Sequence, residues 1–416
     1  MKELRVRAER IRTAIESLGS IGRGASGGLE RTAFSAADLE GREWLKAAMR
    51  GAGLAVRTDE AANIWGLRRG ESQKLPPIAC GSHIDTVPGG GRYDGALGVI
   101  LALEAARVLA EQGVSMRRGL EVVSFSAEEP NGFGLSTFGS RAAAGKLKRS
   151  VLDGVKDDRG VLLADALRQA GGDPQRFEEA RLAPGDLAAY LEVHIEQGRR
   201  LEERGAPIGI VTAITGIYRV EVTVLGEANH AGTTLMRDRR DALMAAAELM
   251  LAFEAACREA PAEETVGTIG RIGSYPNAAN IIPGRVQLHL EVRGATQGDM
   301  GAVLEAWRER ARGVETRRGV RLHSAVLLDQ PPVPMDGLVA EVCRGQAQRL
   351  GYGHLSLGSM AGHDAAHMAS LTRSGMLFVP SIGGRSHCPE EESRLCDIEK
   401  AGNVLLHALL ALDRKL

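Results

Sequence analysis

Four segments of the sequence place metal-binding side chains at or just beyond the ends of short apolar runs. The runs cover 77–80, 122–125, 187–193 and 376–379, and the side chains are His83, Glu128 with Glu129, His194 and His387. Short apolar runs bounded by turn residues are typical of buried strands. Ligands of open α/β sheets bind beyond the carboxyl ends of the strands. We therefore expect one sheet to bring the four points together.

A glycine-rich stretch supplies the first candidates. It reads Gly-Ser-His-Ile-Asp-Thr-Val-Pro and then Gly-Gly-Gly-Arg-Tyr-Asp-Gly-Ala, and it contains His83, Asp85 and Asp94. A neutral imidazole can bind a metal through one nitrogen while Asp85 accepts the other N–H, which fixes the tautomer and raises the basicity of the ring. Asp94 could bridge two ions. The alternative is a surface loop with a structural histidine, and the other three segments argue against it.

Glu128 and Glu129 are adjacent carboxylates at an apolar strand end. Repulsion and desolvation raise the pKa of whichever carboxylate lacks a cation. A division of roles resolves this conflict. We expect Glu129 to bind a metal and stay ionised, and Glu128 to take a proton from the attacking water and deliver it to the leaving nitrogen. Alone, such a pair is more often a solvated strand end, so the interpretation depends on its place among the four segments.

The full set of expected metal ligands contains three histidines, one shared aspartate and one glutamate: His83, Asp94, Glu129, His194 and His387. Nitrogen and oxygen donors of this kind suit zinc or manganese, and cobalt or nickel would also fit. We expect two divalent ions per subunit. Cys388 is a rival ligand, but Pro389 and two glutamates beside it disfavour a thiolate. Gln197, three residues after His194, is a candidate contact to the substrate.

The middle of the chain offers polar side chains for substrate binding. Arg293 ends an alternating strand, and its planar fork could hold a carboxylate through two charge-assisted hydrogen bonds. Asn280 could add an amide donor, and Asn277 lies in the same turn. His230 could polarise the scissile carbonyl or hold its oxyanion. Arg219 is a second candidate anion binder. A surface ion pair and a turn of asparagines remain the alternative interpretations.

The elements that must position these residues predict two domains, because 416 residues exceed one ordinary core. In residues 1–211 and 329–416, short apolar strands alternate with helical patterns, as in an α/β layer. A crossover helix is expected over 98–111, with Gly113 just past its end. Further helices are expected over 3–17, 336–350 and 398–412.

Residues 212–328 have a different pattern and are expected to form an inserted domain. Strands are predicted within 219–225, 265–293 and 321–328, and helices over 241–257 and 296–312. The order β-α-β-β-α-β is typical of a ferredoxin-like α+β domain.

Composition excludes several classes of partner. The chain has 44% hydrophobic and 25% charged residues, which is typical of a globular protein. Its net charge is −1, and no long block of one sign offers a footprint for nucleic acid or a membrane surface. The five cysteines are scattered, and we find no signal-peptide core and no run of ~18 apolar residues. We expect a cytoplasmic protein with a small-molecule substrate.

Taken together, the motifs resemble the amidase, hydantoinase and carbamoylase family of dinuclear metallo-exopeptidase-like hydrolases. The resemblance covers nearly the whole chain. Its motifs are Gly81 to Gly98, Glu128-Glu129-Pro-Asn-Gly-Phe-Gly, Phe138-Gly-Ser-Arg, His194-Ile-Glu-Gln-Gly, Asn229-His230-Ala-Gly-Thr-Thr, Asn280-Ile-Ile-Pro-Gly, Gly362-His363-Asp364-Ala365 and Val379-Pro-Ser.

The resemblance implies a metallo-exopeptidase-like catalytic domain with one metal on His83, Asp94 and His194, a second on Asp94, Glu129 and His387, and Glu128 as the base. It implies that the inserted domain is a lid and the contact of a homodimer, in which His230, Asn280 and Arg293 of one subunit complete the other subunit's site. Leu235, Gly294 and Cys388 depart from the family pattern.

Family members hydrolyse ureido compounds that carry a carboxylate. The resemblance therefore implies cleavage of the ureido C–N bond of an N-carbamoyl-L-amino acid or related ureido acid, releasing ammonia, carbon dioxide and the amino acid. The alternatives are an allantoate or ureidoglycine amidohydrolase, favoured by Arg219, and an aminoacylase or dipeptidase with the same ligands. A carrier or scaffold without catalysis is disfavoured by the intact Glu128.

Overall fold

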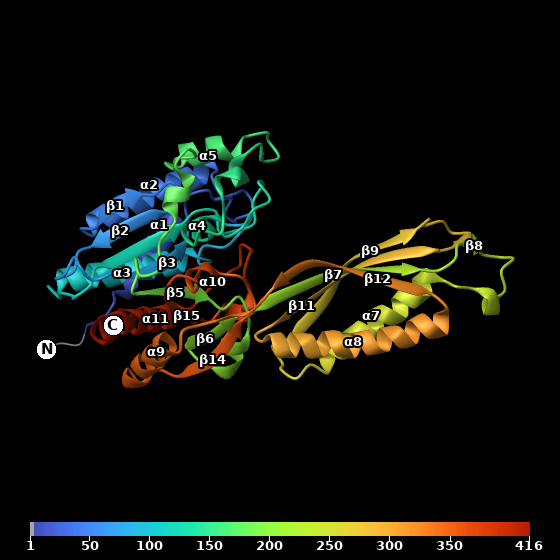
Figure 1. Cartoon of the computed structure of the whole chain (residues 1–416). Helices are drawn as coiled ribbons and strands as arrows, with labels where there is room; N and C mark the ends of the chain where they lie inside the picture. Colours follow the sequence, from blue (N-terminus) through green and yellow to red (C-terminus); the bar gives the residue numbers. More distant parts are fainter. Residues whose placement is uncertain (1–3) are drawn as a thin grey trace. The chain divides into compact units, whose positions relative to one another are not determined.

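The computed structural model describes residues 4–416, which form two compact units (Figure 1). Unit 1 contains the described residues up to Thr212, Pro334–Leu357 and Gly362–Leu416, and unit 2 contains Ala213–Val333 with Gly358–Ala361. Residues 358–361 belong to unit 2, which was not predicted from the sequence. Residue 3, the expected start of the first helix, lies outside the described residues.

Unit 1 is built on a mixed sheet in the order β1-β2-β4-β3-β5-β15-β6-β13, with β14 pairing β6. Its central strands β4, β3, β5 and β15 are parallel neighbours, so their carboxyl ends meet at one edge. These strands are buried along nearly their whole length, as expected for parallel strands covered on both faces. The strands are β1 (Ala55–Thr58), β2 (Ile64–Arg68), β3 (Ile78–His83), β4 (Leu120–Phe125), β5 (Ala189–Ile195), β6 (Ile208–Ile214), β13 (Val333–Pro334), β14 (His354–Ser359) and β15 (Arg373–Val379).

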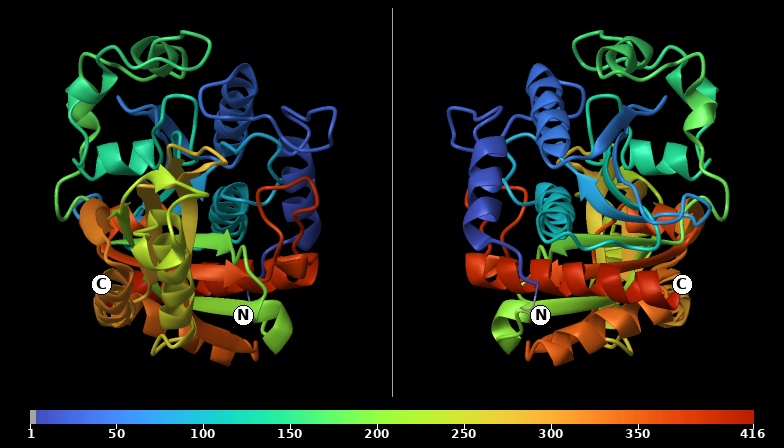
Figure 2. Two further views of the ribbon diagram at one scale, coloured as in Figure 1. Left: turned by 90° about the vertical axis from the view of Figure 1, so that its right-hand side faces the viewer. Right: turned by 90° about the vertical axis from the view of Figure 1, so that its left-hand side faces the viewer.

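Most helices of unit 1 belong to two core clusters (Figure 2). A large core cluster joins the sheet to α1 (Ala8–Leu18), α2 (Ala36–Gly51), α3 (Ala96–Glu111), α9 (Gly337–Arg349) and α11 (Leu395–Lys415). A smaller cluster includes residues of α4 (Phe138–Ala143), α5 (Leu163–Gln169) and η2 (Phe177–Ala180). The other short helices are η1 (Arg149–Leu152), α6 (Arg200–Arg204), α10 (Ala365–Met368) and η4 (Ile382–Gly384).

The crossover helix predicted over 98–111 is confirmed as α3, which connects β3 to β4. It is buried on nearly all sides, which explains why its sequence is apolar all round rather than along one stripe. Helix α2 was not predicted. Its N-terminus is capped by Ser35, whose side chain accepts the N–H of Asp38, a local signal of the kind that marks helix starts.

Unit 2 is a four-stranded antiparallel sheet in the order β12-β7-β11-β9, and two helices cover one of its faces. Its elements are β7 (Gly216–Leu225), α7 (Ala242–Arg258), β9 (Val266–Tyr275), β11 (Arg285–Gly294), α8 (Gln297–Arg318) and β12 (Arg321–Gln330), with β8 (Asn229–His230), η3 (Met236–Asp238) and β10 (Ile281–Ile282) in connections. The main elements follow the expected order β-α-β-β-α-β. On β7 and β11 alternate residues pack against the helices, and the others face away from them.

Two predicted strands end later than expected. His83 is the last residue of β3, and His194 lies inside β5 rather than after it. Hydrogen bonding to neighbouring strands continues through both histidines, so their backbone positions are fixed by the sheet. Among residues 4–416 no helix has both the length and the apolar character needed to cross a membrane.

Candidate metal centre

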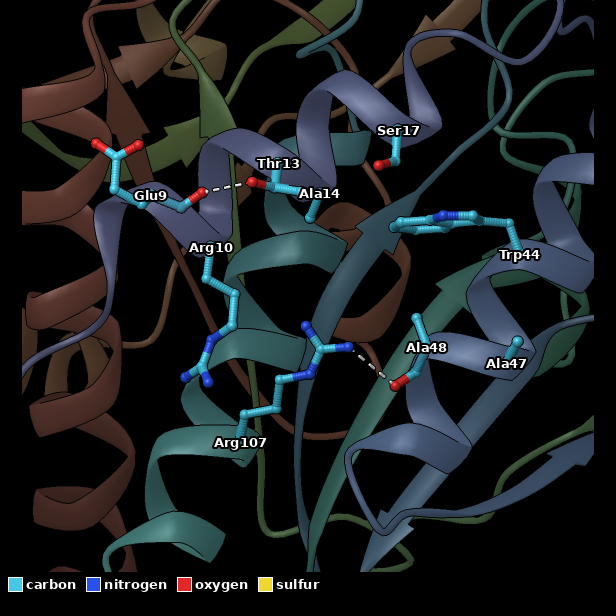
Figure 3. A pocket seen from close by; sticks show the side chains of 9 residues that line it. All are labelled: Glu9, Arg10, Thr13, Ala14, Ser17, Trp44, Ala47, Ala48 and Arg107. Atoms are coloured by element: carbon cyan, nitrogen blue, oxygen red, sulfur yellow. Dashed lines mark hydrogen bonds between the residues drawn. The ribbon is translucent and has the colours of Figure 1, made fainter.

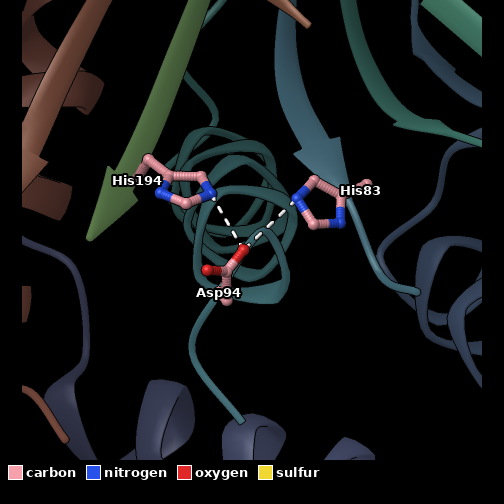
Figure 4. Close-up of side chains that lie close together, drawn as sticks. All are labelled: His83, Asp94 and His194. Atoms are coloured by element: carbon pink, nitrogen blue, oxygen red, sulfur yellow. Dashed lines mark ion pairs between the residues drawn. The ribbon is translucent and has the colours of Figure 1, made fainter. Parts of the chain in front are cut away.

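The five expected metal ligands come together in two groups that share Asp94. In the first group, Nε2 of His83 lies 3.5 Å and Nε2 of His194 lies 3.2 Å from Oδ1 of Asp94. Figure 4 shows the two imidazoles, from the ends of β3 and β5, pointing from opposite sides toward the aspartate that precedes α3. All three residues are buried.

The second group adds His387 and Glu129 to the other oxygen of Asp94. Nε2 of His387 lies 3.4 Å from Oδ2 of Asp94 and 3.2 Å from Oε1 of Glu129. Within each group the potential ligand atoms lie within 4.8 Å of one another. Zinc binds such donors at about 2.0–2.2 Å, so one cation could lie among the donor atoms of each group after small adjustments.

Gly95 allows Asp94 and His83 to approach each other. Its φ of +62° is in the left-handed region, and a Cβ atom there would lie 2.3 Å from the His83 ring. Only glycine fits both the conformation and the space. Gly95 therefore permits a close approach of the backbone to the His83 ring.

Backbone carbonyls orient the two buried histidines. Nδ1 of His83 lies 3.1 Å from the backbone oxygen of Asp85, and Nδ1 of His194 lies 2.9 Å from that of Ile195. Nδ1–H donation to these oxygens directs Nε2 of each ring toward Asp94 as the potential metal donor. In this structure Nε2 of His194 accepts the backbone N–H of Gly95 at 3.1 Å. The expected partner of His83 was the Asp85 carboxylate, whose Oδ1 is more distant at 3.6 Å. That carboxylate instead accepts the backbone N–H groups of Glu128 and Glu129, at 3.2 and 3.1 Å.

The centre concentrates negative charge in a buried place. Asp85, Asp94, Glu128 and Glu129 are all buried. Burial, together with nearby carboxylates, raises the pKa of Glu128 well above its usual range despite the opposing effect of His83. Burial also raises the pKa of Asp85 to about 7. Four buried carboxylates require compensation, and two divalent cations would supply four positive charges, so the residues present fit a dinuclear site.

The histidines respond to the same charges. Burial alone would lower the pKa of His83, but the carboxylates of Glu128 and Asp94 raise it well above its usual range. Hydrogen bonds to Asp94 and Glu129 raise the pKa of His387 to about 10. Cations placed among these carboxylates would take over the role of the imidazolium protons.

Sequence reasoning missed two residues that hold Asp94. Glu391 is buried, and its Oε1 accepts the backbone N–H groups of Tyr93 and Asp94 at 2.8 and 3.1 Å. Oγ of Ser386 lies 2.9 Å from Oδ2 of Asp94 and 3.0 Å from Oε2 of Glu391. Both residues lie in the segment of His387, and no local pattern distinguishes Glu391 from its exposed neighbour Glu390.

A second missed group lies beside His194. The His363 ring packs edge-on at 4.5 Å from the His194 ring. Glu192 is fully buried and accepts hydrogen bonds from Oγ of Ser82 at 2.6 Å and from the backbone N–H of Ala365 at 2.9 Å. The motif around His363 was part of the family resemblance, but no role was assigned to it. These contacts connect β3, β5 and the start of α10 behind the metal ligands.

Gln197 lies in the centre, and Cys388 does not belong to either donor group. Nε2 of Gln197 donates to Oδ2 of Asp94 at 2.7 Å and lies 3.3 Å from Nε2 of His387. The amide of Gln197 therefore contacts two members of the second donor group, Asp94 and His387. The thiol of Cys388 is free.

The remaining candidates belong to unit 2 and fall into two places. Arg219 and Arg293 lie together on β7 and β11, where both bind the carboxylate of Glu291. The exposed His230 is on β8, paired with β10, and the backbone oxygen of Asn280 accepts the N–H of Ala231 at 3.0 Å. Asn277 has a φ of +59° in the same connection.

Comparison with known proteins assigns the chain to a family. Residues 79–411 match the family model described as peptidase family M20/M25/M40. An N-carbamoyl-L-amino acid amidohydrolase of Geobacillus stearothermophilus is 38% identical over 97% of this chain and 98% of its own length. A ureidoglycolate hydrolase of Arabidopsis thaliana is 37% identical over 99% of this chain and 87% of its own length.

A solved structure agrees. A hydantoinase/carbamoylase family amidase from Burkholderia ambifaria superposes with a TM-score of 0.90 at 32% identity, covering 99% of this chain and 98% of the other. The chain is a hydantoinase/carbamoylase amidase of peptidase family M20/M25/M40. The family and the hydrolase class expected from the motifs are confirmed. Enzymes of the M20 family are metal-dependent, in agreement with the donor cluster.

This amidase also has a concavity of about 530 Å³ that contains none of the predicted site residues. Figure 3 shows it between α1, α2 and α3, with the Trp44 ring and the Arg107 guanidinium on its wall. Nη2 of Arg107 donates to the backbone oxygen of Ala48 at 3.2 Å, and Arg10 is paired with Glu104 and Glu111. Its cations are therefore already engaged within the protein.

Proposed function

We propose that this amidase hydrolyses the ureido C–N bond of an N-carbamoyl-L-amino acid or a related ureido acid. The observation that carries the proposal is the pair of donor groups joined by Asp94, with the carboxylate of Glu128 beside them. Oε2 of Glu128 lies 3.7 Å from Nε2 of His83, but Glu128 belongs to neither donor group. Its carboxylate is therefore available for proton transfer.

The residues divide into two sets of ligands. His83, Asp94 and His194 would hold one divalent ion, and Asp94, Glu129 and His387 the other, with zinc or manganese the best match to these donors. When bound, such ions lower the pKa of a coordinated water and polarise a carbonyl group. Asp85 fixes the segment of Glu128 and Glu129 by accepting both backbone N–H groups.

Glu128 would act as general base and then as general acid. Without metal, burial and neighbouring carboxylates raise the pKa of Glu128 above its usual range. The same surroundings would help Glu128 to hold a proton taken from the attacking water. It would then deliver the proton to the leaving nitrogen, as catalysis of this kind requires. The carbamate that leaves would decay to carbon dioxide and ammonia, and the amino acid would be released.

Substrate binding would involve unit 2. Arg293 and Arg219 offer guanidinium donors to a carboxylate, Asn280 an amide, and His230 a donor to the developing oxyanion. The named substrates of the two relatives, an N-carbamoyl amino acid and ureidoglycolate, share a ureido group and a carboxylate, which supports this reading. We further propose a cytoplasmic homodimer in which unit 2 of one subunit completes the site of the other.

Allantoate and ureidoglycine are the alternative substrates. Arg219 supports them, because the family resemblance implies that allantoate-type members also have an arginine at this position. An aminoacylase or dipeptidase could use the same ligands, but the relatives with high coverage favour ureido compounds.

A substrate panel tests the proposal. The protein is stripped with a chelator, reloaded with zinc or manganese, and offered N-carbamoyl, N-acetyl and dipeptide forms of the same amino acid together with allantoate. We expect ammonia release from ureido acids to exceed cleavage of the acetyl and dipeptide forms at least about a hundredfold. Preferred cleavage of the acetyl or dipeptide form would refute the ureido assignment.

A further inference from the structure

Glu291 lies between the two arginines proposed to bind the substrate carboxylate. Arg219 on β7 is the direct cross-strand partner of Glu291 on β11, and Arg293 is two residues further along β11. Oε2 of Glu291 accepts Nε of Arg219 at 2.8 Å and also its Nη2, while Oε1 accepts Nε of Arg293 at 2.7 Å. Strand alternation places all three side chains on the sheet face that α7 and α8 leave uncovered.

The contacts of Glu291 leave donors for a ligand. Nη1 of Arg293 reaches the backbone oxygen of Met360 at 3.4 Å. Within residues 4–416, neither Nη1 of Arg219 nor Nη2 of Arg293 makes a hydrogen bond. The side chains of Arg219 and Arg293 are 41% and 34% exposed, and that of Glu291 is 18% exposed. The carboxylate is thus less exposed than the two guanidinium groups that it binds, and one nitrogen of each guanidinium has no hydrogen-bond partner among the described residues.

The carboxylate also sets the charge of this group. Partial burial would raise the pKa of Glu291, but hydrogen bonds from Arg293 and Arg219 lower it below its ordinary value. Glu291 is therefore ionised at neutral pH, and the three residues together carry one net positive charge. That charge matches one carboxylate. A second carboxylate on the same ligand would be repelled by Glu291, and the group would have no remaining positive charge to balance it.

We propose that Glu291 is a positioning residue that orients Arg219 and Arg293 and restricts the amidase to ureido acids with a single carboxylate. The proposal rests on the function proposed above, because it assigns the substrate carboxylate to these arginines. Ureido acids with two carboxylates, such as N-carbamoyl-L-aspartate, would bind poorly because their second negative charge lies near Glu291.

The same two strands supply a matched control. Glu221 is two residues along β7 from Arg219, and its cross-strand partner is His289. Nε2 of His289 lies 3.2 Å from Oε2 of Glu221. A Glu221→Gln change thus removes one carboxylate from the same face of the sheet without touching either arginine.

The experiment compares Glu291→Gln and Glu221→Gln with the unaltered enzyme on N-carbamoyl-L-alanine and N-carbamoyl-L-aspartate. For Glu291→Gln we expect kcat/KM for the aspartate compound, relative to the alanine compound, to rise about tenfold, mainly through KM. Added salt should reduce the change, because the effect is electrostatic. Glu221→Gln should leave the ratio within about twofold. An unchanged ratio in Glu291→Gln, or an equal change in both variants, would overturn the proposal.

Two further measurements keep the test independent of folding and of turnover. Glu291→Asp retains the negative charge and should retain the preference for N-carbamoyl-L-alanine over N-carbamoyl-L-aspartate. Arg219→Gln removes a positive charge and should strengthen this preference. A weaker preference in either variant would count against the proposal. Calorimetry of N-carbamoyl-L-alanine and N-carbamoyl-L-aspartate binding to the metal-loaded protein tests, without catalysis, whether a ligand with one carboxylate binds more tightly than one with two. If these compounds bind with the expected preference but are not hydrolysed, the proposed function fails and the inference stands.

Discussion

The carboxylate of Glu391 accepts the backbone N–H of Asp94 at 3.1 Å, across 297 positions of the chain. The same oxygen accepts the N–H of Tyr93, and Ser386 lies between the carboxylates of Glu391 and Asp94. The aspartate shared by both donor groups is therefore held through its backbone and its side chain by the segment that also carries His387.

Removal of the Glu391 carboxylate should weaken metal binding at both groups. For Glu391→Ala we expect metal affinity to fall about 10- to 100-fold, the usual cost of losing a residue that orients a ligand. Competition with a chelator, followed by metal analysis, measures it. Glu390→Ala is the control, because Glu390 is exposed and pairs with Arg385. Equal affinities in the two variants would show that Glu391 does not hold the site.

The role of Glu128 can be separated from that of Glu129. Glu128→Gln should keep both metals and lower kcat about 10³- to 10⁴-fold, because the amide cannot take the proton. Glu129→Gln should lose metal from the second group, of which Glu129 is a member. Metal content and initial rates of both variants test this assignment. Substantial turnover by Glu128→Gln would refute the base.

Metal uptake should release a proton from His387. Hydrogen bonds to Asp94 and Glu129 raise its pKa from 6.5 to about 10, so without metal the ring is charged at neutral pH, whereas a ligand must be neutral. The metal affinity of the second donor group, Asp94, Glu129 and His387, should therefore rise with pH across the neutral range. Calorimetry in buffers of different ionisation enthalpy should detect the proton released on metal binding. The His387→Asn variant should release about one proton fewer than the unaltered protein. Identical release by both proteins would contradict the prediction.

The loop that supports the Glu128 segment should be sensitive to Asp59. This buried carboxylate accepts the N–H groups of Ala61 and Asn63, the Asn63 amide and the Trp65 indole. Oδ1 of Asn63 in turn accepts the N–H of Ser126 at 3.0 Å. We expect Asp59→Ala to cost about 3 kcal/mol of unfolding free energy, because several buried donors lose their acceptor. Denaturant unfolding of the metal-free protein measures it, with the exposed Asp153→Ala as control. Equal stability of the two variants would count against this network.

The sequence was sufficient to expect that the five donor side chains lie close together and to predict most of the α/β elements. Strands such as β4 are buried on both faces and flanked by turn residues, so the run itself identifies them. Because the carboxyl ends of parallel strands meet at one edge of a sheet, His83 and His194 could be expected near each other from the sequence alone. Helix α2 was missed although two local signals mark it, since Ser35 caps its start and its buried residues recur at helical spacing.

Contacts between distant side chains could not be predicted in the same way. Glu391 is one of three consecutive acidic residues in a loop, and only the folded chain shows that it is the one turned toward Asp94. The alternation of β11 placed Arg293 on a face, but the cross-strand register that joins Glu291 to Arg219 is a property of the sheet. Likewise the carboxylate of Asp85 accepts the backbone N–H groups of Glu128 and Glu129, and it is the backbone oxygen of Asp85 that lies closest to Nδ1 of His83.

The anchoring of His83 and His194 in buried, hydrogen-bonded strands has a consequence for how the enzyme acquires its cofactor. When core packing and strand pairing already place the metal ligands, the protein does not need a cation to fold, unlike a zinc finger. We therefore expect the empty polypeptide to be as well ordered as the loaded one, and the ions to be exchanged without unfolding. With a donor set that tolerates several first-row elements, cellular supply would then decide which one occupies the cage.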